Sequence, residues 1–206
     1  MPMRTQAERS VTTRALILDA AVASLVADGY ERTTTVSVQA RAGVSRGRLL
    51  HHFPSRAHLL VAAAQHLAGT RIAEMEEWAL GGYASCSDQG ERCDRATDQL
   101  WETFSQPYFW AAMELWNAAR TDPDLRTALV EPERQLGRAI QHVVAAMFGP
   151  TLSSHPRFEE LRELLFTSMR GAALTYALRM RDPLADPHLP SWRRLARATL
   201  LGPSTP

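Results

Sequence analysis

Residues 33–59 restrict the fold of this 206-residue chain more than any other segment. Thr34 and Ser45 each precede a run of helix-forming residues, and threonine and serine are preferred at the N-cap of a helix. Gly43 stands between the two runs, where a left-handed glycine can end a helix. Pro54 then interrupts the chain, because proline is excluded from a helix interior. The segment therefore predicts two short helices joined by a tight turn, with a longer helix after them.

The rest of the sequence also favours helices. Apolar residues recur at three- and four-residue steps, and no segment alternates with period two for long. We therefore predict an all-α fold of about nine helices. Their expected ranges are residues 12–28, 34–42, 45–52, 55–80, 94–105, 107–120, 122–147, 157–180 and 190–201. Residues 81–93 are expected to form a polar connector.

Charge is unevenly distributed along the chain. Residues 1–58 hold eight arginines and four acidic residues, whereas the remainder holds 15 arginines and 18 acidic residues. A basic front end on a mildly acidic body indicates a polyanionic partner for the front end only. The chain has no lysine, so each arginine contact can be bidentate.

The second short helix is the basic element of that front end. A helix-turn-helix places its second helix in the major groove of DNA, with residues near its N-terminus against the base edges. Arg46 and Arg48 occupy those positions and can each bind guanine through two hydrogen bonds. The alternative is that both are solvated surface charges. The residues expected to contact bases or phosphates are Thr34, Ser45, Arg46, Gly47, Arg48, His51, His52 and Arg56.

Other kinds of site are less favoured by the sequence. Residues 43–47 match the G-x-S-x-G motif of α/β-hydrolases, but that motif needs a strand before it, and an N-cap explains its serine better. His51 and His52 are adjacent on a helix and so do not face a shared metal ion. Cys86 and Cys93 lack the spacing of a zinc or redox pair and are expected to be loop thiols. We expect no enzyme activity, no cofactor and no metal.

The composition is that of a globular protein. Hydrophobic residues make up 45% of the chain and charged residues 22%. No apolar run approaches the length of a membrane span, and the first residues carry no apolar signal segment. We therefore expect a cytoplasmic protein without a membrane partner.

Residues 17–59 read ILDAAVASLVADGYERTTTVSVQARAGVSRGRLLHHFPSRAHL. They resemble the N-terminal domain of TetR-type (tetracycline-repressor-like) regulators in the Ile-Leu-x-Ala-Ala helix, its Gly-Tyr ending, the Thr-capped second helix, the Ala-Gly-Val-Ser turn and the His-Phe-Pro-Ser-basic run. The resemblance implies a three-helix helix-turn-helix DNA-binding domain over residues 1–54. It implies a helical ligand-binding and dimerisation domain over residues 55–206, with helix 55–80 connecting the two. Such a regulator is most often a repressor that leaves a palindromic operator when a small molecule binds.

Four positions depart from common usage in that family. Leu50 stands where tyrosine, whose hydroxyl contacts DNA, is common, and Gln39 stands where a small alanine is usual. Arg48 replaces a small polar residue, and Arg56 stands where a lysine often meets phosphate. The operator sequence therefore does not carry over from the resemblance.

Two other classes of function remain open. An all-helical enzyme would need a convergent acid, base or metal cluster, and the sequence offers none that we can identify. A helical adaptor that only dimerises would leave the basic second helix unexplained.

Aromatic residues are concentrated between residues 78 and 116, where eight of the fifteen occur. At helical spacing they make apolar stripes, which are typical either of core packing or of a pocket wall. The resemblance favours a pocket for a hydrophobic or aromatic effector, with Glu114, Gln141 and His142 as further polar anchors. The residues expected to line it are Trp78, Trp101, Phe104, Tyr108, Trp110, Met113, Trp116, Asn117, Phe166, Met169, Arg170 and Tyr176.

Residues 160–180 form an apolar helical stripe with a small-residue step at Gly171-Ala172-Ala173 that permits close helix approach. The resemblance implies that the last two long helices form a four-helix interface in a homodimer, as two-fold reading of a palindrome requires. The alternative is that this helix is the buried centre of a monomer. The residues expected at the interface are Leu161, Leu165, Ala172, Ala173, Tyr176, Met180, Trp192 and Leu195.

Overall fold

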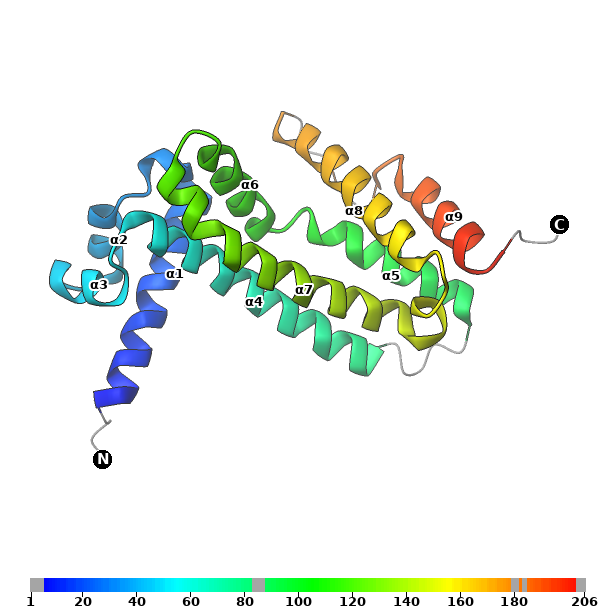
Figure 1. The fold of residues 1–206 in the computed structure, drawn as a ribbon, viewed down its shortest axis with the longest axis horizontal. Helices are drawn as coiled ribbons and strands as arrows, with labels where there is room; N and C mark the ends of the chain where they lie inside the picture. Colours follow the sequence, from blue (N-terminus) through cyan, green and yellow to red (C-terminus); the bar gives the residue numbers. More distant parts are fainter. Residues whose placement is uncertain (1–5, 83–87, 179–181, 183–184, 203–206) are drawn as a thin grey trace. The chain divides into compact units, whose positions relative to one another are not determined.

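Helices make up the regular structure in the described part of the chain. The computed structural model describes residues 6–82, 88–178, 182 and 185–202 (Figure 1). In chain order the elements are α1 (Gln6–Arg32), α2 (Thr35–Ala42), α3 (Arg46–His52), α4 (Arg56–Gly82), α5 (Gln89–Thr103), α6 (Pro107–Ala119), α7 (Pro123–Ser153), α8 (Phe158–Leu174), the 3-10 turn η1 (Thr175–Ala177) and α9 (Leu189–Leu200). The predicted all-α class, with about nine helices, is confirmed within these ranges.

The start of α5 differs from the prediction. The Asp88 carboxylate accepts hydrogen bonds from the backbone N–H groups of Gly90 (3.0 Å) and Glu91 (3.2 Å), so it caps a helix within the predicted connector. Cys93 is therefore not a loop thiol but a buried residue of α5. Burial, reinforced by the neighbouring Asp94, raises the pKa of its thiol to about 12. Cys86 lies outside the described residues.

The end of α8 also differs from the prediction. α8 ends at Leu174 and passes into η1, where the Thr175 hydroxyl donates a hydrogen bond to the carbonyl of Ala172 (2.7 Å). The predicted end at Met180 lies outside the described residues. In α7, Gly149 adopts φ 80° and ψ 166°, which interrupts the helix near its predicted end before a last turn resumes.

The chain divides into two compact units, and unit 1 comprises residues 1–71 and 107–137. Within it a buried cluster joins α1, α2, α3 and α4. Leu49 is 1% exposed and Phe53 is 3% exposed in this cluster, so both hold α3 to its neighbours. The other large buried members are Ile17, Leu18, Val38 and Leu59. Because α3 is held from one side, its opposite side is exposed.

Helix α1 is longer and more apolar than the sequence analysis recognised. Its segment Ser10–Arg32 is long and apolar enough to cross a membrane by length and composition. The apolar side chains of Ile17, Leu18, Ala21 and Leu25 are instead buried in unit 1. The segment therefore serves as a core helix of a globular unit.

Unit 2 comprises residues 72–106 and 138–206. Its centre is an aromatic cluster contributed by α5, α8, η1 and α9. The Trp101 ring centroid lies 4.8 Å from that of Trp192 and 5.8 Å from that of Tyr176. Trp101 is 1% exposed, so this cluster is the sealed core of the unit.

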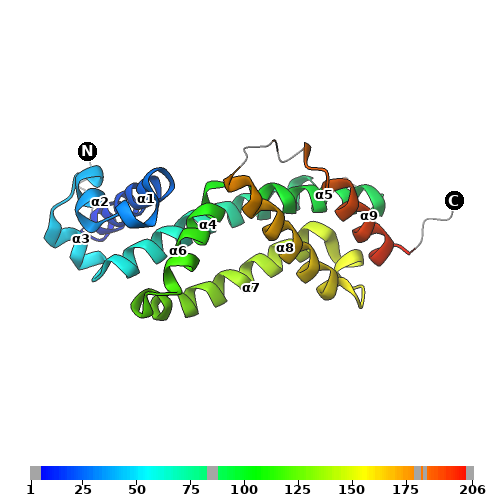
Figure 2. The same ribbon diagram turned by 90° about the horizontal axis from the view of Figure 1, so that it is seen from above.

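Two arginines of α9 also hold it to α5, and the two helices lie side by side in Figures 1 and 2. Arg193 pairs with Asp98 (Nε–Oδ1 2.5 Å), and Arg197 pairs with Asp94 (Nε–Oδ1 2.7 Å). In each pair a second guanidinium nitrogen binds the other carboxylate oxygen. These bidentate pairs fix the register of α9 on α5.

The two compact units are defined by which residues pack together, and their boundaries differ from the predicted domain boundary at residue 54. Unit 1 also includes α4 as far as Arg71, all of α6, and α7 as far as Gly137. The predicted boundary separates a DNA-binding domain from a ligand-binding domain, and this functional division stays a prediction.

Candidate nucleic-acid interface and effector pocket

Short side-chain caps shape the α2–turn–α3 segment. The Thr34 hydroxyl accepts a hydrogen bond from the Ser37 N–H (3.0 Å), and the Thr34 N–H donates to the Ser37 hydroxyl (2.9 Å), which completes a capping box. Gly43 adopts the left-handed conformation (φ 64°, ψ 32°) that ends α2. The Ser45 hydroxyl accepts from the Arg48 N–H (3.3 Å) and so caps α3. The predicted caps and turn are confirmed, and a helix rather than a strand precedes Ser45.

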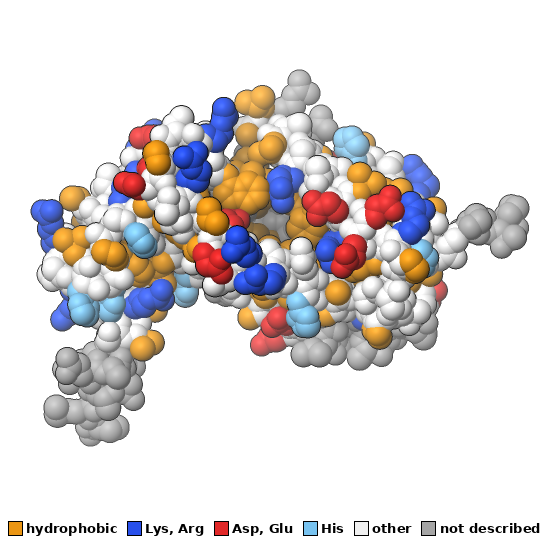
Figure 3. All heavy atoms as spheres, in the orientation of Figure 1, with side chains coloured by type: hydrophobic (Ala, Val, Ile, Leu, Met, Phe, Trp, Pro, Cys, Tyr) orange, Lys and Arg blue, Asp and Glu red, His pale blue; other side chains and the backbone are white. Residues whose placement is uncertain are grey.

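The outward side of α3 is basic and exposed. Leu49 faces the core, while Arg46, Gly47, Arg48 and His51 are exposed. Among the described residues neither Arg46 nor Arg48 has an ion-pair partner. Arginine and histidine side chains gather over the α2–α3 end of the molecule in Figure 3. This surface has the charge and the small protruding helix that a DNA groove accepts.

The α3 histidines lie at the end of the helix, with their ring centroids 5.3 Å apart. The pKa of His52 lies below its usual 6.5 because burial disfavours the charged form, and because His51, Arg14 and Arg48 add positive charge nearby. His52 is therefore mainly neutral at neutral pH in the protein without DNA.

Arg56 is placed differently from the arginines of α3. Its Nε donates to the carbonyl of Thr33 (2.7 Å), and its Nη2 donates to the carbonyl of Tyr30. The guanidinium also lies over the Tyr30 ring, 4.0 Å from the centroid. Arg56 thus holds the start of α4 against the α1–α2 corner.

Tyr30 is a residue whose importance the sequence analysis missed. Its hydroxyl donates to Oδ2 of Asp122 (3.2 Å), and its N–H donates to Oε2 of Glu114 (3.0 Å). Asp122 also caps α7 through the Leu125 N–H (2.9 Å), and this hydrogen bond is the main reason that its pKa is lowered. The corner of the helix-turn-helix is therefore bonded to α6 and to the α6–α7 corner. The sequence signal was Tyr30 directly after the helix-ending Gly29, which leaves the Tyr30 N–H without a helical partner.

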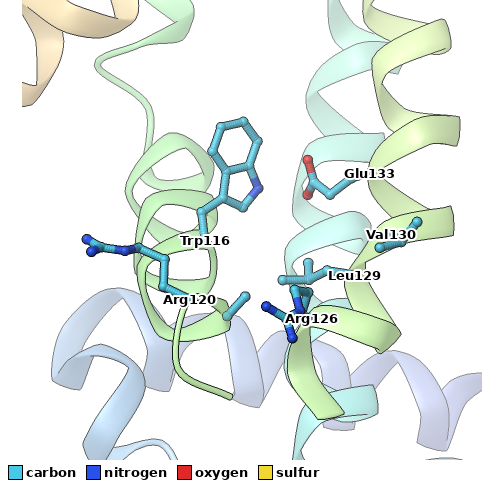
Figure 4. A pocket seen from close by; sticks show the side chains of 7 residues that line it. Trp116, Arg120, Arg126, Leu129, Val130 and Glu133 are labelled. Atoms are coloured by element: carbon cyan, nitrogen blue, oxygen red, sulfur yellow. The ribbon is translucent and has the colours of Figure 1, made fainter. Parts of the chain in front are cut away.

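A hollow of about 530 Å³ lies between α6 and α7 within unit 1 (Figure 4). Its lining residues are Trp116, Ala119, Arg120, Arg126, Leu129, Val130 and Glu133. Trp116 is 36% exposed and faces Leu129 and Glu133 across the hollow, whereas the Arg120 guanidinium points away from α7. Leu129 also belongs to the buried cluster that contains Tyr30 and Leu115, so this wall of the hollow continues into the core.

Residues 17–63, which span most of α1, all of α2 and α3, and the start of α4, match the family described as "Bacterial regulatory proteins, tetR family". Over this segment the chain is similar to TetR-family proteins, and its curated relatives are named as HTH-type transcriptional regulators.

Proteins similar to this chain carry the same kind of description. It is 28% identical to the HTH-type transcriptional regulator CymR of Pseudomonas putida over 171 residues, which cover 83% of this chain and 82% of that protein. It is 28% identical to the HTH-type transcriptional repressor AcnR of Corynebacterium diphtheriae over 140 residues, which cover 68% and 67% of the two chains. The structure resembles that of the transcriptional regulator FadR from Bacillus subtilis in complex with stearoyl-CoA, with a TM-score of 0.64 at 16% identity, covering 92% of this chain and 99% of that one. This last likeness shows the fold.

The residues predicted to line an effector pocket fall into separate places. Trp116 lines the hollow, and its neighbour Asn117 is exposed. Trp101 and Met169 are 1% and 0% exposed in the core of unit 2, where Phe104, Phe166 and Tyr176 pack with them. The structure leaves Tyr108, Trp110, Met113 and Arg170 half-buried, and none of the four lines the hollow. The side chain of Trp78 lies outside the described residues.

The predicted polar anchors are also dispersed. Glu114 binds the N–H of Tyr30, and Gln141 and His142 are exposed on α7. The Tyr176 hydroxyl donates a hydrogen bond to the buried Asp186 carboxylate. These contacts are structural within each unit.

The residues predicted to form the dimer interface lie mostly on the inner side of α8 and α9. Leu161, Leu165 and Ala173 are at most 2% exposed, and Trp192 is 6% exposed with its indole N–H bonded to Ser168 Oγ (3.1 Å). Ala172 and Tyr176 are half-buried, and Met180 lies outside the described residues. The leucines exposed on the outer side of these two helices and the turns after them are Leu164, Leu174, Leu178, Leu195 and Leu201.

Proposed function

We propose that this protein is a repressor that binds a palindromic operator as a homodimer and leaves it when an apolar or aromatic small molecule binds. The outward side of α3 carries the proposal, because Arg46 and Arg48 are exposed there without an ion-pair partner among the described residues. Arginines without an ion-pair partner repel one another within the protein. The same charges attract the phosphates of a polyanion such as DNA. Operator binding places the protein in the cytoplasm.

Arg46 and Arg48 are the residues to which we assign base contacts. Each can bind the O6 and N7 atoms of a guanine, for about 1–3 kcal/mol of discrimination. His51 and Gly47 lie on the same side of α3. Thr34, Ser45 and His52 are assigned to phosphates. The Ser45 hydroxyl accepts a capping bond and keeps its own proton to donate, whereas the Thr34 hydroxyl donates to Ser37 Oγ (3.2 Å) and would exchange that bond for one to a phosphate.

Arg56 is assigned a supporting role in the same surface. Its hydrogen bonds to the carbonyls of Tyr30 and Thr33 fix the start of α4 against the residues that lead into α2. A guanidinium occupied in this way positions the reading helices, and any phosphate contact uses its remaining N–H groups.

The homodimer interface is assigned to the outer side of α8 and α9. A leucine that is fully buried within the subunit cannot touch a partner, which excludes direct contact by Leu161 and Leu165. Leu164 (51% exposed) and Leu195 (37% exposed) are available instead. The inner residues support this interface by holding α8 and α9 in place. The α3 helices of the two subunits then lie about one DNA turn apart, roughly 34–36 Å.

The effector site is assigned to the hollow between α6 and α7. Trp116, Leu129 and Val130 offer an apolar surface, and its volume of about 530 Å³ suits a small molecule. The similar FadR structure is a complex with stearoyl-CoA, a ligand with a long apolar part. The residues predicted in unit 2, Trp101 above all, are assigned to packing.

Release of DNA is assigned to the contacts between Tyr30, Glu114 and Asp122. They join the helix-turn-helix to α6 and to the α6–α7 corner, within the same unit as the hollow. An effector that binds better when α6 and α7 are displaced shifts the population toward a state in which Tyr30 has moved. Linkage then requires operator DNA to weaken effector binding by the same factor.

Selection of duplexes from random DNA tests the proposed function. The wild-type protein should enrich a palindrome, and its affinity should fall steeply with salt, with a log–log slope of about −0.9 for each phosphate neutralised. A helical enzyme or a simple adaptor should enrich no sequence and show a flat salt response, which would overturn the proposal. An effector found by its release of this operator should lose its effect on Trp116→Ala, while operator affinity without effector stays at the wild-type value.

A further inference from the structure

Leu49 and Leu50 are adjacent in α3 but lie in opposite environments. Leu49 is 1% exposed in the core of unit 1, whereas Leu50 is 39% exposed, about 100° further around the helix. A single exposed leucine is ordinary on a protein surface, so exposure alone assigns no role. The position is informative because Leu50 flanks the outward side of α3, beside the exposed Arg46 and His51.

Gly47 lies at the middle of that outward side, three residues before Leu50. A Cβ atom built there meets nothing within 4 Å, and Gly47 is not among the glycines with positive φ. The fold therefore does not require glycine at this position, although glycine is less favourable than alanine in a helix. A missing side chain at the middle of a basic face allows the helix backbone to approach a partner closely.

We infer that Leu50 packs against the C5-methyl group of a thymine in the major groove and so reads one base of each operator half-site, with Gly47 providing the clearance. This inference rests on the proposed DNA-binding function. Thymine is the standard base that presents a methyl group in the major groove, and apolar side chains recognise it by contact. Leucine has no hydrogen-bonding group, so it cannot serve a phosphate or a polar base edge. The exposed Arg46 beside Leu50, and Arg48 on the other flank of the outward side, select DNA as the occupant of this surface.

The spacing within α3 predicts where the thymine lies. Arg46 and Leu50 are four residues apart, which corresponds to about 6 Å along a helix. Base pairs are stacked about 3.4 Å apart. The guanine bound by Arg46 and the thymine read by Leu50 should therefore lie within about two base pairs of each other.

Replacing thymine by uracil tests this inference, because it removes the methyl group and nothing else. Each thymine of the selected operator is replaced in turn, in both half-sites, and the affinities of wild-type protein and of Leu50→Ala are measured. At one position the replacement should weaken wild-type binding about fourfold per half-site, the value for one buried methyl group. The same replacement should leave Leu50→Ala unaffected, and Leu50→Asn, which keeps much of the volume, should behave like Leu50→Ala.

Two further variants separate DNA contact from folding. Gly47→Ala should melt at or above the wild-type temperature and still bind the operator more weakly. Leu16→Ala removes a more exposed leucine (51%) from α1 and should keep the uracil response of the wild type.

The possible outcomes are distinct. A uracil response of equal size in wild type and Leu50→Ala overturns the role of Leu50, and so does wild-type affinity in Leu50→Ala. Gly47→Ala with unchanged affinity overturns the clearance assigned to Gly47. If the wild-type protein enriches no DNA sequence, the proposed function itself fails and this inference with it.

Discussion

Helices α3 and α9 are both short and rich in arginine, yet the structure uses their charges in opposite ways. Arg193 and Arg197 of α9 each bind a carboxylate of α5 through two nitrogens. Arg46 and Arg48 of α3 have no ion-pair partner among the described residues. Basic composition therefore does not by itself identify a DNA-reading helix. The informative property is whether the fold has already neutralised the arginines.

The apolar residues of the two helices extend the comparison. On α9, Trp192 is buried against Trp101, and its indole N–H is bonded to Ser168. On α3, Leu49 alone is buried, and the remaining side chains are exposed or half-buried. α9 is thus fixed by packing and charge together, while α3 is anchored by Leu49 and the adjoining Phe53 and offers its other sides to a partner.

The largest effect should come from removing both α3 arginines. Arg46→Ala with Arg48→Ala should weaken operator binding by about 2–6 kcal/mol per half-site, since each bidentate contact is worth roughly 1–3 kcal/mol. Titration of a labelled operator measures the loss, and thermal unfolding should show an unchanged midpoint. Arg95→Ala, which removes one exposed arginine of α5 that is paired with Glu91, is the control for a loss of charge elsewhere on the protein. Equal losses in the two proteins would show that α3 contributes only general charge.

The next largest effect should come from the buried anchor of α9. Trp192→Ala should lower the free energy of unfolding by about 3–5 kcal/mol, because it leaves a cavity against Trp101. Arg194→Ala, an exposed change on the same helix, should stay within about 0.5 kcal/mol of wild type. Chemical denaturation measures both. A loss below about 1 kcal/mol for Trp192→Ala would mean that α9 is not packed as described.

A smaller effect should follow from removing the paired arginines of α9. Arg193→Ala with Arg197→Ala should cost about 1 kcal/mol of stability in total, because both pairs are more than a quarter exposed and solvent screens them. The cost should shrink as salt is added.

Operator affinity provides the comparison with α3 for this pair of changes. Above the concentration at which the proposed homodimer forms, the α9 double variant should bind the operator as tightly as Arg95→Ala. A loss similar to that of the α3 double variant would contradict the distinction between the two helices.

The smallest effect should be a pH dependence at His52. The pKa of His52 is lowered in the folded protein, so near pH 6 the unfolded chain binds more protons, and stability falls as the pH drops below about 6.5. A nearby DNA phosphate acts in the opposite direction by favouring the charged imidazole. Operator affinity should therefore rise a few-fold between about pH 7.5 and about pH 6. His52→Gln should flatten this rise, and an unchanged pH profile would remove His52 from the phosphate contacts.

Local signals in the sequence predicted the α2–turn–α3 segment well. Thr34, Gly43 and Ser45 act through neighbours three or four residues away, so the sequence alone specifies the caps and the turn. Asp88 gives a signal of the same kind, followed three residues later by Glu91, and it was overlooked in a stretch assigned to a connector.

The sequence did not predict in the same way which helices, distant in the chain, pack against each other. Trp101 and Trp116 both belong to aromatic helical stripes, yet one is sealed in a core and the other borders a hollow. The difference depends on which helix packs against each, and sequence spacing does not specify that. Leu161 and Leu164 show the same limit on α8, since an amphipathic pattern finds an apolar side without telling an inner core from a partner's surface.

The central claim, that the outward side of α3 reads base sequence, is tested most directly by a specificity ratio. The ratio of affinities for the selected operator and for random duplex is measured at about 0.15 M salt, for wild type and for the Arg46→Ala, Arg48→Ala protein. We expect a ratio of about 10³ or more for wild type, and loss of most of that ratio in the variant. A wild-type ratio near one, or an undiminished ratio in the variant, would contradict it.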